Sequence, residues 1–570
     1  MKTKNINKQL IHWIPVIIFI AIAIGFRLYR NSADNYYLLA GSDGPYLPIQ
    51  VKSLFQHFRL AFPDMPLLFV LCTILAKVLF FIKLGTENEC ILMSIRLIDS
   101  FLPPLAAIPV FLITKELCTE NIKSKFSNYF LVAFSILSFT PLFLFSFQLQ
   151  KNGLATVFIF TYLYYAIKLI KYQQRIDAVK ASIVLFICVI SHIGSFGLLV
   201  FISLTTLIIW LLIQKNKLNG PFLKIALGIA ALLIITFSLI AVFDFSRFNR
   251  IINVPLKVFE APVLLFALNG QNFVLHGPTL FILIAQNLLT VIGLILLIVK
   301  RKQIETYKLI LGMALGACSL FLSNPFLGLE WASRLYMMAY IPTTVLYIII
   351  YNTTSSIWIK IPTVSVFAVL LILSVGTSAF DKSYMTIDNA SFIELQTMKD
   401  KNLFLKNDAI VARQSLRILS NWVFETKGVD KYLLTKEEFN KYSSVYLLKQ
   451  IKGKNTKLRG AEPSLGDSIL TVYKSEHFEV YKVTNNSQLP IKEEKIFKGI
   501  RGTVQSIEKD IILVNDNKTN KIRKIHFDCN NTTFPKLSNG MKLEINGEWL
   551  PFSLDIKAET IKELSGFEEN

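Results

Sequence analysis

The sequence predicts an α-helical polytopic membrane domain of about eleven spans, followed by an extracytoplasmic α/β module and a small β-barrel of the OB type. Three observations predict this fold class. Hydrophobic residues make up 53% of the 570 residues, which is too apolar for one soluble core. Apolar runs of roughly 18 residues recur from the N-terminus to residue 377. Beyond that residue the sequence is polar, and short alternating segments replace the long runs.

The excess of basic over acidic residues is explained by the short loops between membrane segments. The formal net charge is +21, and much of the lysine and arginine lies in short loops, where membrane topology and lipid headgroups account for it. We therefore expect membrane lipids, and no nucleic acid, among the partners. The six cysteines are scattered, with no CxxC pair, so the sequence indicates neither a metal site nor a disulfide framework.

The apolar runs are interpreted as helices in chain order. The first, residues 11–26, follows a lysine-bearing N-terminus but has no small-residue cleavage site, so we interpret it as a retained span. Residues 181–213 leave open whether two short helices or one long tilted helix with a half-helix occur. The other runs lie at residues 66–82, 91–114, 128–147, 153–170, 222–243, 277–299, 307–323, 334–351 and 357–377.

The basic short loops predict the orientation. The positive-inside rule puts them in the cytoplasm with the lysine-rich N-terminus. The basic loops and the N-terminus lie on the same side of the membrane only if the run 66–82 does not cross it. Lys77 at the centre of this run and the prolines before it also favour a helix that does not cross. We expect a plasma (inner) membrane protein with a cytoplasmic N-terminus and extracytoplasmic C-terminal modules. The loops are residues 115–125, 171–180, 214–224 and 300–308.

The domain boundaries follow from the changes in hydropathy. We expect a membrane domain over 1–377 with its first outer loop over 27–90, an α/β module over 378–484, a linker over 485–495 and a barrel over 496–570.

Within the module, the patterns predict helices at 392–405, 416–426 and 436–452, a strand at 409–412 and a hairpin at 469–483. Barrel strands are expected at 502–507, 511–515, 521–527, 541–548 and 556–561. OB barrels bind oligonucleotides or oligosaccharides in known cases, but a fold does not decide function. We expect a packing or spacing role here.

The candidate catalytic residue is Asp43, in the first outer loop. It stands in the segment Gly41-Ser42-Asp43-Gly44-Pro45, a turn that presents the carboxylate to an approaching molecule. The alternative is that Asp43 only caps the helix that begins near Leu47.

Several other polar residues fall at the expected outer ends of spans. They predict a pocket under the first loop with one carboxylate and several cations, which suits a substrate that carries phosphate. The carboxylate is then free to take a proton from an attacking hydroxyl. The candidate binding residues are His57, Arg59, Arg96, Lys151, His192 and Arg334, with Asp99, Gln148 and Glu330 beside them.

Each of these residues also has a purely structural interpretation. Arg96 and Asp99 are spaced i, i+3 and would neutralise each other. His192 would be a hydrogen-bonded kink residue. Lys151 and Arg334 would be snorkelling residues at helix ends. The sequence leaves these alternatives open.

Five motifs accompany the acidic residue of the first outer loop. They are the Pro-flanked apolar segment 62–68, Arg96-Leu97-Ile98-Asp99-Ser100, Thr140-Pro141-Leu142 leading to Ser146, Ser191-His192 and Ser333-Arg334-Leu335-Tyr336. In these features the membrane part resembles the GT-C superfamily of membrane glycosyltransferases, which includes protein mannosyltransferases, aminoarabinose transferases and oligosaccharyltransferases. The motifs are loose and cover the membrane part only.

The resemblance implies that Asp43 is the catalytic base, that Lys151 and Arg334 bind the lipid-linked phosphate, and that the donor is a polyprenyl-phosphate sugar. One departure concerns the metal. Many relatives carry a second acidic residue after the third span, whereas this chain reads Gln148-Leu149-Gln150-Lys151-Asn152. No cofactor is therefore assigned, and a divalent cation is left open. The cytoplasmic side also lacks a Gly-rich phosphate loop for a nucleotide-sugar donor.

The leading hypothesis is an inverting hexosyl- or pentosyltransferase. It would move a sugar from a lipid phosphate to a glycan, lipid or protein acceptor at the outer face, in envelope glycan or glycoconjugate synthesis. One alternative is a transporter or flippase of lipid-linked sugars, which would place its charged sites near mid-membrane in two related halves. The other is a non-catalytic envelope assembly protein, which would show no transfer with its fold intact and donor supplied.

Overall fold

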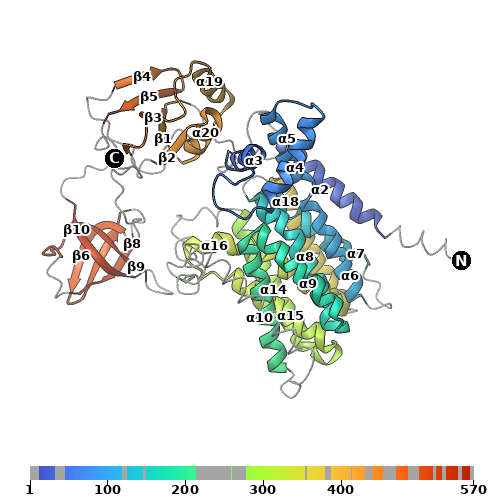
Figure 1. Cartoon of the computed structure of the whole chain (residues 1–570). Helices are drawn as coiled ribbons and strands as arrows, with labels where there is room; N and C mark the ends of the chain where they lie inside the picture. Colours follow the sequence, from blue (N-terminus) through green and yellow to red (C-terminus); the bar gives the residue numbers. More distant parts are fainter. Residues whose placement is uncertain are drawn as a thin grey trace. The chain divides into compact units, whose positions relative to one another are not determined.

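The computed structural model gives the arrangement of the helices and strands (Figure 1). It describes residues 12–32, 45–118, 125–145, 149–213, 258–259, 278–353, 356–378, 387–412, 414–430, 439–452, 470–484, 500–517, 521–528, 534–549 and 555–564. The chain forms two compact units. Unit 1 comprises Met1–Leu199 and Thr354–Glu493, and unit 2 comprises Val200–Thr353 and Glu494–Asn570.

Unit 1 begins with helices that overlap the expected apolar runs, together with α3, which lies in the first outer loop. In chain order these are α2 (Ile14–Ser32), α3 (Tyr46–His57), α4 (Leu67–Phe81), α5 (Glu87–Phe101), the 3-10 turn η1 (Pro103–Ala106), α6 (Ala107–Leu117), α7 (Lys125–Leu137), the π turn η2 (Thr140–Leu144), α8 (Gln150–Tyr172), α9 (Arg175–Ser191), α10 (Ile193–Ile213), which continues into unit 2, and α18 (Ile357–Ser378). The region that the sequence left open, residues 181–213, therefore contains two helices that meet at His192.

The run 91–114 is interrupted by two prolines. Helix α5 starts at a capping box, in which the Thr86 N–H donates to Glu89 Oε2 at 2.8 Å and the Thr86 hydroxyl accepts from the Glu89 N–H at 3.4 Å. It ends before Pro103 and Pro104, because proline lacks the N–H that continues a helix. The chain tightens into the 3-10 turn and resumes as α6.

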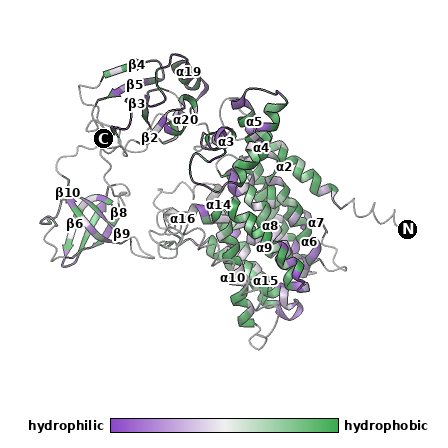
Figure 2. Ribbon diagram, in the orientation of Figure 1, coloured by the Kyte–Doolittle hydropathy of each residue, from purple (hydrophilic) through white to green (hydrophobic). Residues whose placement is uncertain are grey.

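Six helical segments of the described chain are long and apolar enough to cross a membrane. Their apolar character is visible in Figure 2, where α10 is coloured hydrophobic along most of its length. The chain is therefore an integral membrane protein. The expected total of about eleven spans stays a prediction, because other apolar helices are shorter and the run 222–243 lies outside the described residues. The six segments are Ile14–Asn31, Glu87–Leu117, Gln150–Tyr172, Ile193–Ile213, Arg334–Thr353 and Ile357–Gly376.

Helix α4, the run expected not to cross, is one of the shorter helices. It has a buried face that includes Phe69 and Cys72 and an exposed apolar face that includes Ile74 and Phe81. Lys77 lies at the side of the helix, with its ammonium 4.1 Å from the ring centroid of Phe58. A short helix with one apolar exposed face suits an interfacial position.

The orientation can be tested by cysteine labelling. In a variant without native cysteines, we expect a cysteine restored at 529 to react with an impermeant thiol reagent on intact cells. A Glu120→Cys variant should react only after permeabilisation, because the positive-inside rule puts that basic loop in the cytoplasm. Both positions lie outside the described residues. Reaction at 120 without reaction at 529 would reverse the orientation.

After α18, unit 1 forms an α/β module. It contains α19 (Asn389–Asp400), β1 (Ala409–Ala412), α20 (Gln414–Phe424), β2 (Lys427–Asp430), β3 (Val445–Gln450), β4 (Leu470–Lys474) and β5 (Phe478–Val483). The sheet order is β2-β1-β3-β5-β4. Strand β1 is parallel to β2 and β3, and β5 is antiparallel to β3 and β4. The expected strand 409–412 and the hairpin are confirmed.

The helix expected at 436–452 was wrong, because β3 occupies its second half. Val445, Leu447 and Leu448 are buried, and both edges of β3 pair with other strands. Pairing on two sides satisfies the backbone and overrides the local helical pattern.

The α/β module and the first outer loop share one hydrophobic core. Side chains of α3, α4 and α5 cluster with those of α19, α20, β1, β3 and β5, among them Val51, Phe69 and Trp422. An ion pair between Lys52 Nζ and Glu425 Oε1, at 2.7 Å, joins α3 to the residue after α20. The domain boundaries expected from the sequence stay predictions, but the module packs on α3.

Unit 2 contains a helical part and a barrel. The helices are α14 (Pro278–Val299), α15 (Thr306–Leu322), α16 (Leu329–Tyr336) and α17 (Tyr340–Thr353), joined to the α10 segment. Buried hydroxyls of Thr290, Ser319 and Thr343 hydrogen bond across α14, α15 and α17, at 2.6 to 3.3 Å. Such contacts hold membrane helices together.

The barrel of unit 2 confirms the strands expected from the alternating pattern. They are β6 (Ile500–Glu508), β7 (Ile511–Asp516), β8 (Lys521–His526), β9 (Lys542–Trp549) and β10 (Ile556–Glu563), closed in the order β10-β8-β7-β6-β9. Strands β8 and β10 are parallel, and the other neighbours are antiparallel. At Gly547 a Cβ would collide with the Lys557 carbonyl, so glycine permits the close approach of β9 and β10.

Candidate functional site

Two charged clusters, one buried and one partly exposed, form around residues of the first outer loop. Asp43 lies outside the described residues, as do Gln148 and the side chain of Glu330. The structure describes the two ends of the Asp43 segment, which are the last turn of α2 and Tyr46 at the start of α3. The clusters form at these two ends.

The first cluster is centred on Arg27, which the sequence analysis did not select. The guanidinium is 2% exposed and pairs with the fully buried Asp99 carboxylate, Nη2 to Oδ1 at 2.9 Å. It also donates to three backbone carbonyls, those of Asp99 at 2.7 Å, Pro141 at 2.6 Å and Phe145 at 3.3 Å. Arg27 therefore joins α2 to α5 and to the π turn.

Two neighbours on α2 extend this cluster. Arg30 Nη1 donates to the Leu142 carbonyl at 3.0 Å. Asn31 Nδ2 donates to Ser100 Oγ at 2.7 Å and to Asp99 Oδ2 at 3.4 Å. Residues 27, 30 and 31 share one face of a helix. Polar side chains at this spacing in an apolar segment indicate a buried polar contact, and the sequence analysis did not use this pattern.

Asp99 pairs with Arg27 of α2, a partner that the sequence analysis did not select. Its neutralisation by Arg96, at i, i+3 spacing on α5, was one of the interpretations that the sequence left open. Arg96 is half-buried. Asp99 therefore has a cation from another helix, and a binding role for Arg96 stays a proposal.

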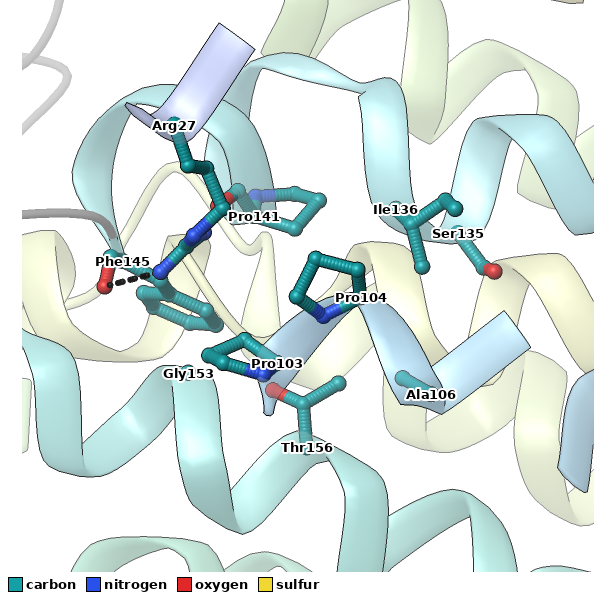
Figure 3. A pocket seen from close by; sticks show the side chains of 10 residues that line it. All are labelled: Arg27, Pro103, Pro104, Ala106, Ser135, Ile136, Pro141, Phe145, Gly153 and Thr156. Atoms are coloured by element: carbon teal, nitrogen blue, oxygen red, sulfur yellow. Dashed lines mark hydrogen bonds between the residues drawn. The ribbon is translucent and has the colours of Figure 1, made fainter. Parts of the chain in front are cut away.

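Figure 3 shows the small pocket beside Arg27, with the guanidinium pointing toward the Phe145 carbonyl and the rings of Pro103, Pro104 and Pro141 around it. The space inside this pocket is enough for about one water molecule. The pocket is therefore too small for a sugar, and it belongs to the packing that fixes Arg27. Gly153 and Thr156 of α8 also line it.

The second cluster is centred on Lys151 and Asp64. Their side chains form an ion pair, with 24% and 11% of each side chain exposed. The Tyr46 hydroxyl donates to Asp64 Oδ2 at 2.6 Å, and the Met65 N–H donates to Oδ1 at 2.7 Å. Gln50 Nε2 donates in turn to the Tyr46 hydroxyl at 2.9 Å. The cluster therefore ties the residue after Pro45 to the first turn of α8.

These contacts keep Asp64 ionised. Burial raises the pKa of Asp64, but the charge of Lys151 and the hydrogen bonds from Lys151, Tyr46 and the Met65 N–H together hold it below its ordinary value of 3.8. The stabilisation from the pair is thus present at neutral pH and is lost only as the pH falls through this lowered pKa. The sequence analysis saw Asp64 only as part of a proline-flanked segment.

Both clusters lie at the same end of α8. Lys151 is in its first turn, and Gly153, two residues later, lines the pocket beside Arg27. The Asp43 segment thus starts from a helix fixed by Arg27 and ends at a helix fixed by Asp64 and Lys151. Lys151 therefore offers one partly exposed cation at this end of α8, the kind of group that binds a phosphate.

The other candidate binding residues are less concentrated. His57 ends α3 and Arg59 follows it, and both are exposed. His192 Nδ1 accepts the Ser195 N–H at 3.1 Å and lies 3.0 Å from Ser195 Oγ, so it caps the start of α10. This contact agrees with the kink interpretation, and a binding role for His192 stays a proposal.

Arg334 belongs to unit 2, on α16. Its side chain is exposed, with the guanidinium carbon 5.7 Å from the Trp331 ring centroid. A cation over an aromatic face is weakly held at an exposed site, so Arg334 has access to a ligand.

Within the described ranges, no group of three or more His, Cys, Asp or Glu side chains is placed to hold a metal ion. The side chains that meet at the first loop are mostly cations and their carboxylate partners. A divalent cation is left open, since Asp43 lies outside those ranges.

No family model matches the chain, and no curated protein matches it either. Among solved structures it is similar to the crystal structure of ArnT from Cupriavidus metallidurans bound to undecaprenyl phosphate, with 12% sequence identity and a TM-score of 0.41, over 83% of this chain and 98% of that chain. At this identity and TM-score the likeness carries no argument about the reaction, which depends on the site residues.

Proposed function

We propose that this protein is a membrane glycosyltransferase of the GT-C type. It moves a sugar from a polyprenyl-phosphate donor to a glycan, lipid or protein acceptor at the outer membrane face, in envelope glycan or glycoconjugate synthesis. The observation that carries the proposal is a pair of charged clusters at one end of α8. Arg27 pairs with Asp99 at the last residues described before the Asp43 segment, and Lys151 pairs with Asp64 beside Tyr46, which follows that segment.

The chemistry needs a base and a site for the leaving phosphate. Asp43 accepts the proton of the acceptor hydroxyl while the hydroxyl oxygen bonds to the anomeric carbon. The bond from that carbon to the phosphate oxygen breaks, and polyprenyl phosphate leaves with the electron pair. One displacement inverts the anomeric centre. A cation near the phosphate stabilises the charge that develops on it.

Lys151 and Arg334 are the proposed phosphate cations. Lys151 lies in the cluster that anchors α3, and Arg334 offers an exposed guanidinium. The remaining candidates, His57, Arg59, Arg96 and His192, are proposed to line the path of the donor or acceptor. The barrel of unit 2 is proposed to be of the OB type with a packing or spacing role.

Replacing either cation tests the phosphate assignment. We expect Lys151→Ala and Arg334→Ala each to weaken the binding of polyprenyl phosphate by roughly tenfold to a hundredfold, because a hydrogen bond to a charged group is worth about 1.5 to 3 kcal/mol. The measurement is a titration of purified protein. Unchanged affinity in both variants would identify them as snorkelling anchors.

The activity itself is tested in cells that lack the protein. We expect a polyprenyl-phosphate sugar to accumulate, as measured by mass spectrometry of extracted lipids, and to disappear when the wild-type gene is restored. The Asp43→Asn variant should not clear it. A Glu116→Gln variant should clear it, because Glu116 pairs with Lys171 at the other end of α8. Absence of any accumulated lipid-linked sugar would contradict the proposal.

A further inference from the structure

Lys151, the cation assigned above to the donor phosphate, is already paired. Its ammonium contacts the Asp64 carboxylate and lies 5.9 Å and 5.7 Å from the ring centroids of Tyr46 and Phe69. A ligand phosphate that reaches this ammonium meets a competing anion. The pair is only partly exposed, so water does little to weaken that competition.

We propose that Asp64 is a positioning residue that competes with the lipid phosphate for Lys151. Donor phosphate takes the ammonium from Asp64 on binding, and Asp64 takes it back as the polyprenyl phosphate product leaves. This inference rests on the proposed function. It adds a residue that sets how tightly donor and product are held.

The contacts of Asp64 make this exchange feasible. When Lys151 leaves, the carboxylate keeps the hydrogen bonds from the Tyr46 hydroxyl at 2.6 Å and the Met65 N–H at 2.7 Å. A carboxylate that retains two donors is not left unsatisfied. The start of α3 therefore stays anchored while the ammonium moves.

The difference between the two clusters supports the assignment. Arg27 makes an ion pair and hydrogen bonds to three backbone carbonyls, so its guanidinium is fixed in a single geometry. Lys151 is a point charge on a flexible four-carbon stem, and its ion pair leaves it partly exposed. The Arg27 cluster is therefore held in one arrangement, whereas Lys151 can exchange its partner.

A proton does not replace the phosphate as the trigger. The pKa of Asp64 is held below 3.8 despite its burial, so the carboxylate stays charged across the neutral range and its pair with Lys151 persists. An anion that competes for the ammonium opens the pair at neutral pH.

The exchange has a consequence for turnover. The donor is a phosphodiester, and the product is a phosphomonoester that carries more negative charge. A free ammonium would hold the product more tightly than the donor. Asp64 competes with the product for the ammonium and so weakens product binding. Removing the Asp64 charge should therefore slow product release and lower both KM and kcat.

The test compares polyprenyl phosphate with the matching uncharged polyprenol, using purified full-length protein in zwitterionic lipid nanodiscs. Asp64→Asn keeps the size and a hydrogen-bond acceptor but removes the charge. We expect it to bind polyprenyl phosphate about tenfold more tightly than wild type, with polyprenol binding unchanged. Glu116→Gln is the matched control, because Glu116 pairs with Lys171, another lysine of α8. The Lys171 and Glu116 side chains are 28% and 15% exposed, and Lys171 lies about 30 Å from Lys151 along the helix.

The double variant Asp64→Asn/Lys151→Met separates competition for Lys151 from other effects of Asp64. We expect the tenfold gain to be lost, since no ammonium is left to free. A gain that persists without Lys151, or weaker phosphate binding by Asp64→Asn alone, would overturn the inference while leaving the proposed function intact. If wild-type protein does not distinguish polyprenyl phosphate from polyprenol, both the phosphate site and this inference are wrong.

Discussion

Asp43→Asn is expected to lower the rate of sugar transfer by about 10² to 10⁴, because a positioned carboxylate that accepts the hydroxyl proton contributes that much. Asn keeps the size of Asp and an oxygen for helix capping, and it removes only the charge. The affinity for polyprenyl phosphate should change little, since the substitution affects the transition state more than the ground state. The measurement is transfer from a lipid-linked donor by purified protein, beside a thermal melt.

Asp43→Ala distinguishes a base from a helix cap. If Asp43 is the base, Ala and Asn lose turnover to a similar degree and both variants fold. If Asp43 only caps α3, Asn behaves as wild type and Ala loses about 1 kcal/mol of stability. Near-normal transfer by Asp43→Asn would remove the carboxylate from the mechanism.

Arg27→Met is expected to destabilise the protein more than any other single change considered. It leaves the Asp99 carboxylate, which is fully buried, without its cation. Breaking a buried pair by removing one partner costs about 3 to 5 kcal/mol. The carbonyls of Pro141 and Phe145 also lose a donor. We expect a large fall in Tm of the detergent-solubilised protein, with loss of activity following from misplacement of the first loop.

Two further variants make this result interpretable. Arg27→Met/Asp99→Leu should recover part of the loss, because no uncompensated charge remains buried. Arg175→Met, at the exposed start of α9, should leave Tm nearly unchanged. An unchanged Tm for Arg27→Met would mean that Asp99 is not charged in the folded protein.

The first outer loop and the α/β module share one hydrophobic core. The module was expected from the sequence as a separate part, but Trp422 and its neighbours pack on α3, where Lys52 pairs with Glu425. Helix α3 begins at Tyr46, three residues after Asp43 in the sequence. The module therefore supports the helix that follows the candidate base, a role that no pattern within the module itself indicates.

The sequence by itself determined the class of the protein and its local elements. Long apolar runs specify membrane helices because the bilayer core has a fixed thickness, and alternation specified the barrel strands because side chains alternate across a strand. The turn at Asp43 stays a prediction, made from its glycines and proline for the same local reason. These properties depend on neighbours a few residues away.

Only the tertiary structure decided which charges meet. Arg27 and Asp99 are 72 positions apart, and Lys151 and Asp64 are 87 apart. The sequence shows where a charge enters an apolar segment but not which helix packs against it, so it identified neither Arg27 as the partner of Asp99 nor Asp64 as the partner of Lys151. Strand β3 was missed for the same reason, since its partners β1 and β5 lie outside its own segment. Burial makes an unpaired charge costly, and the packing of distant elements determines the partner that offsets that cost.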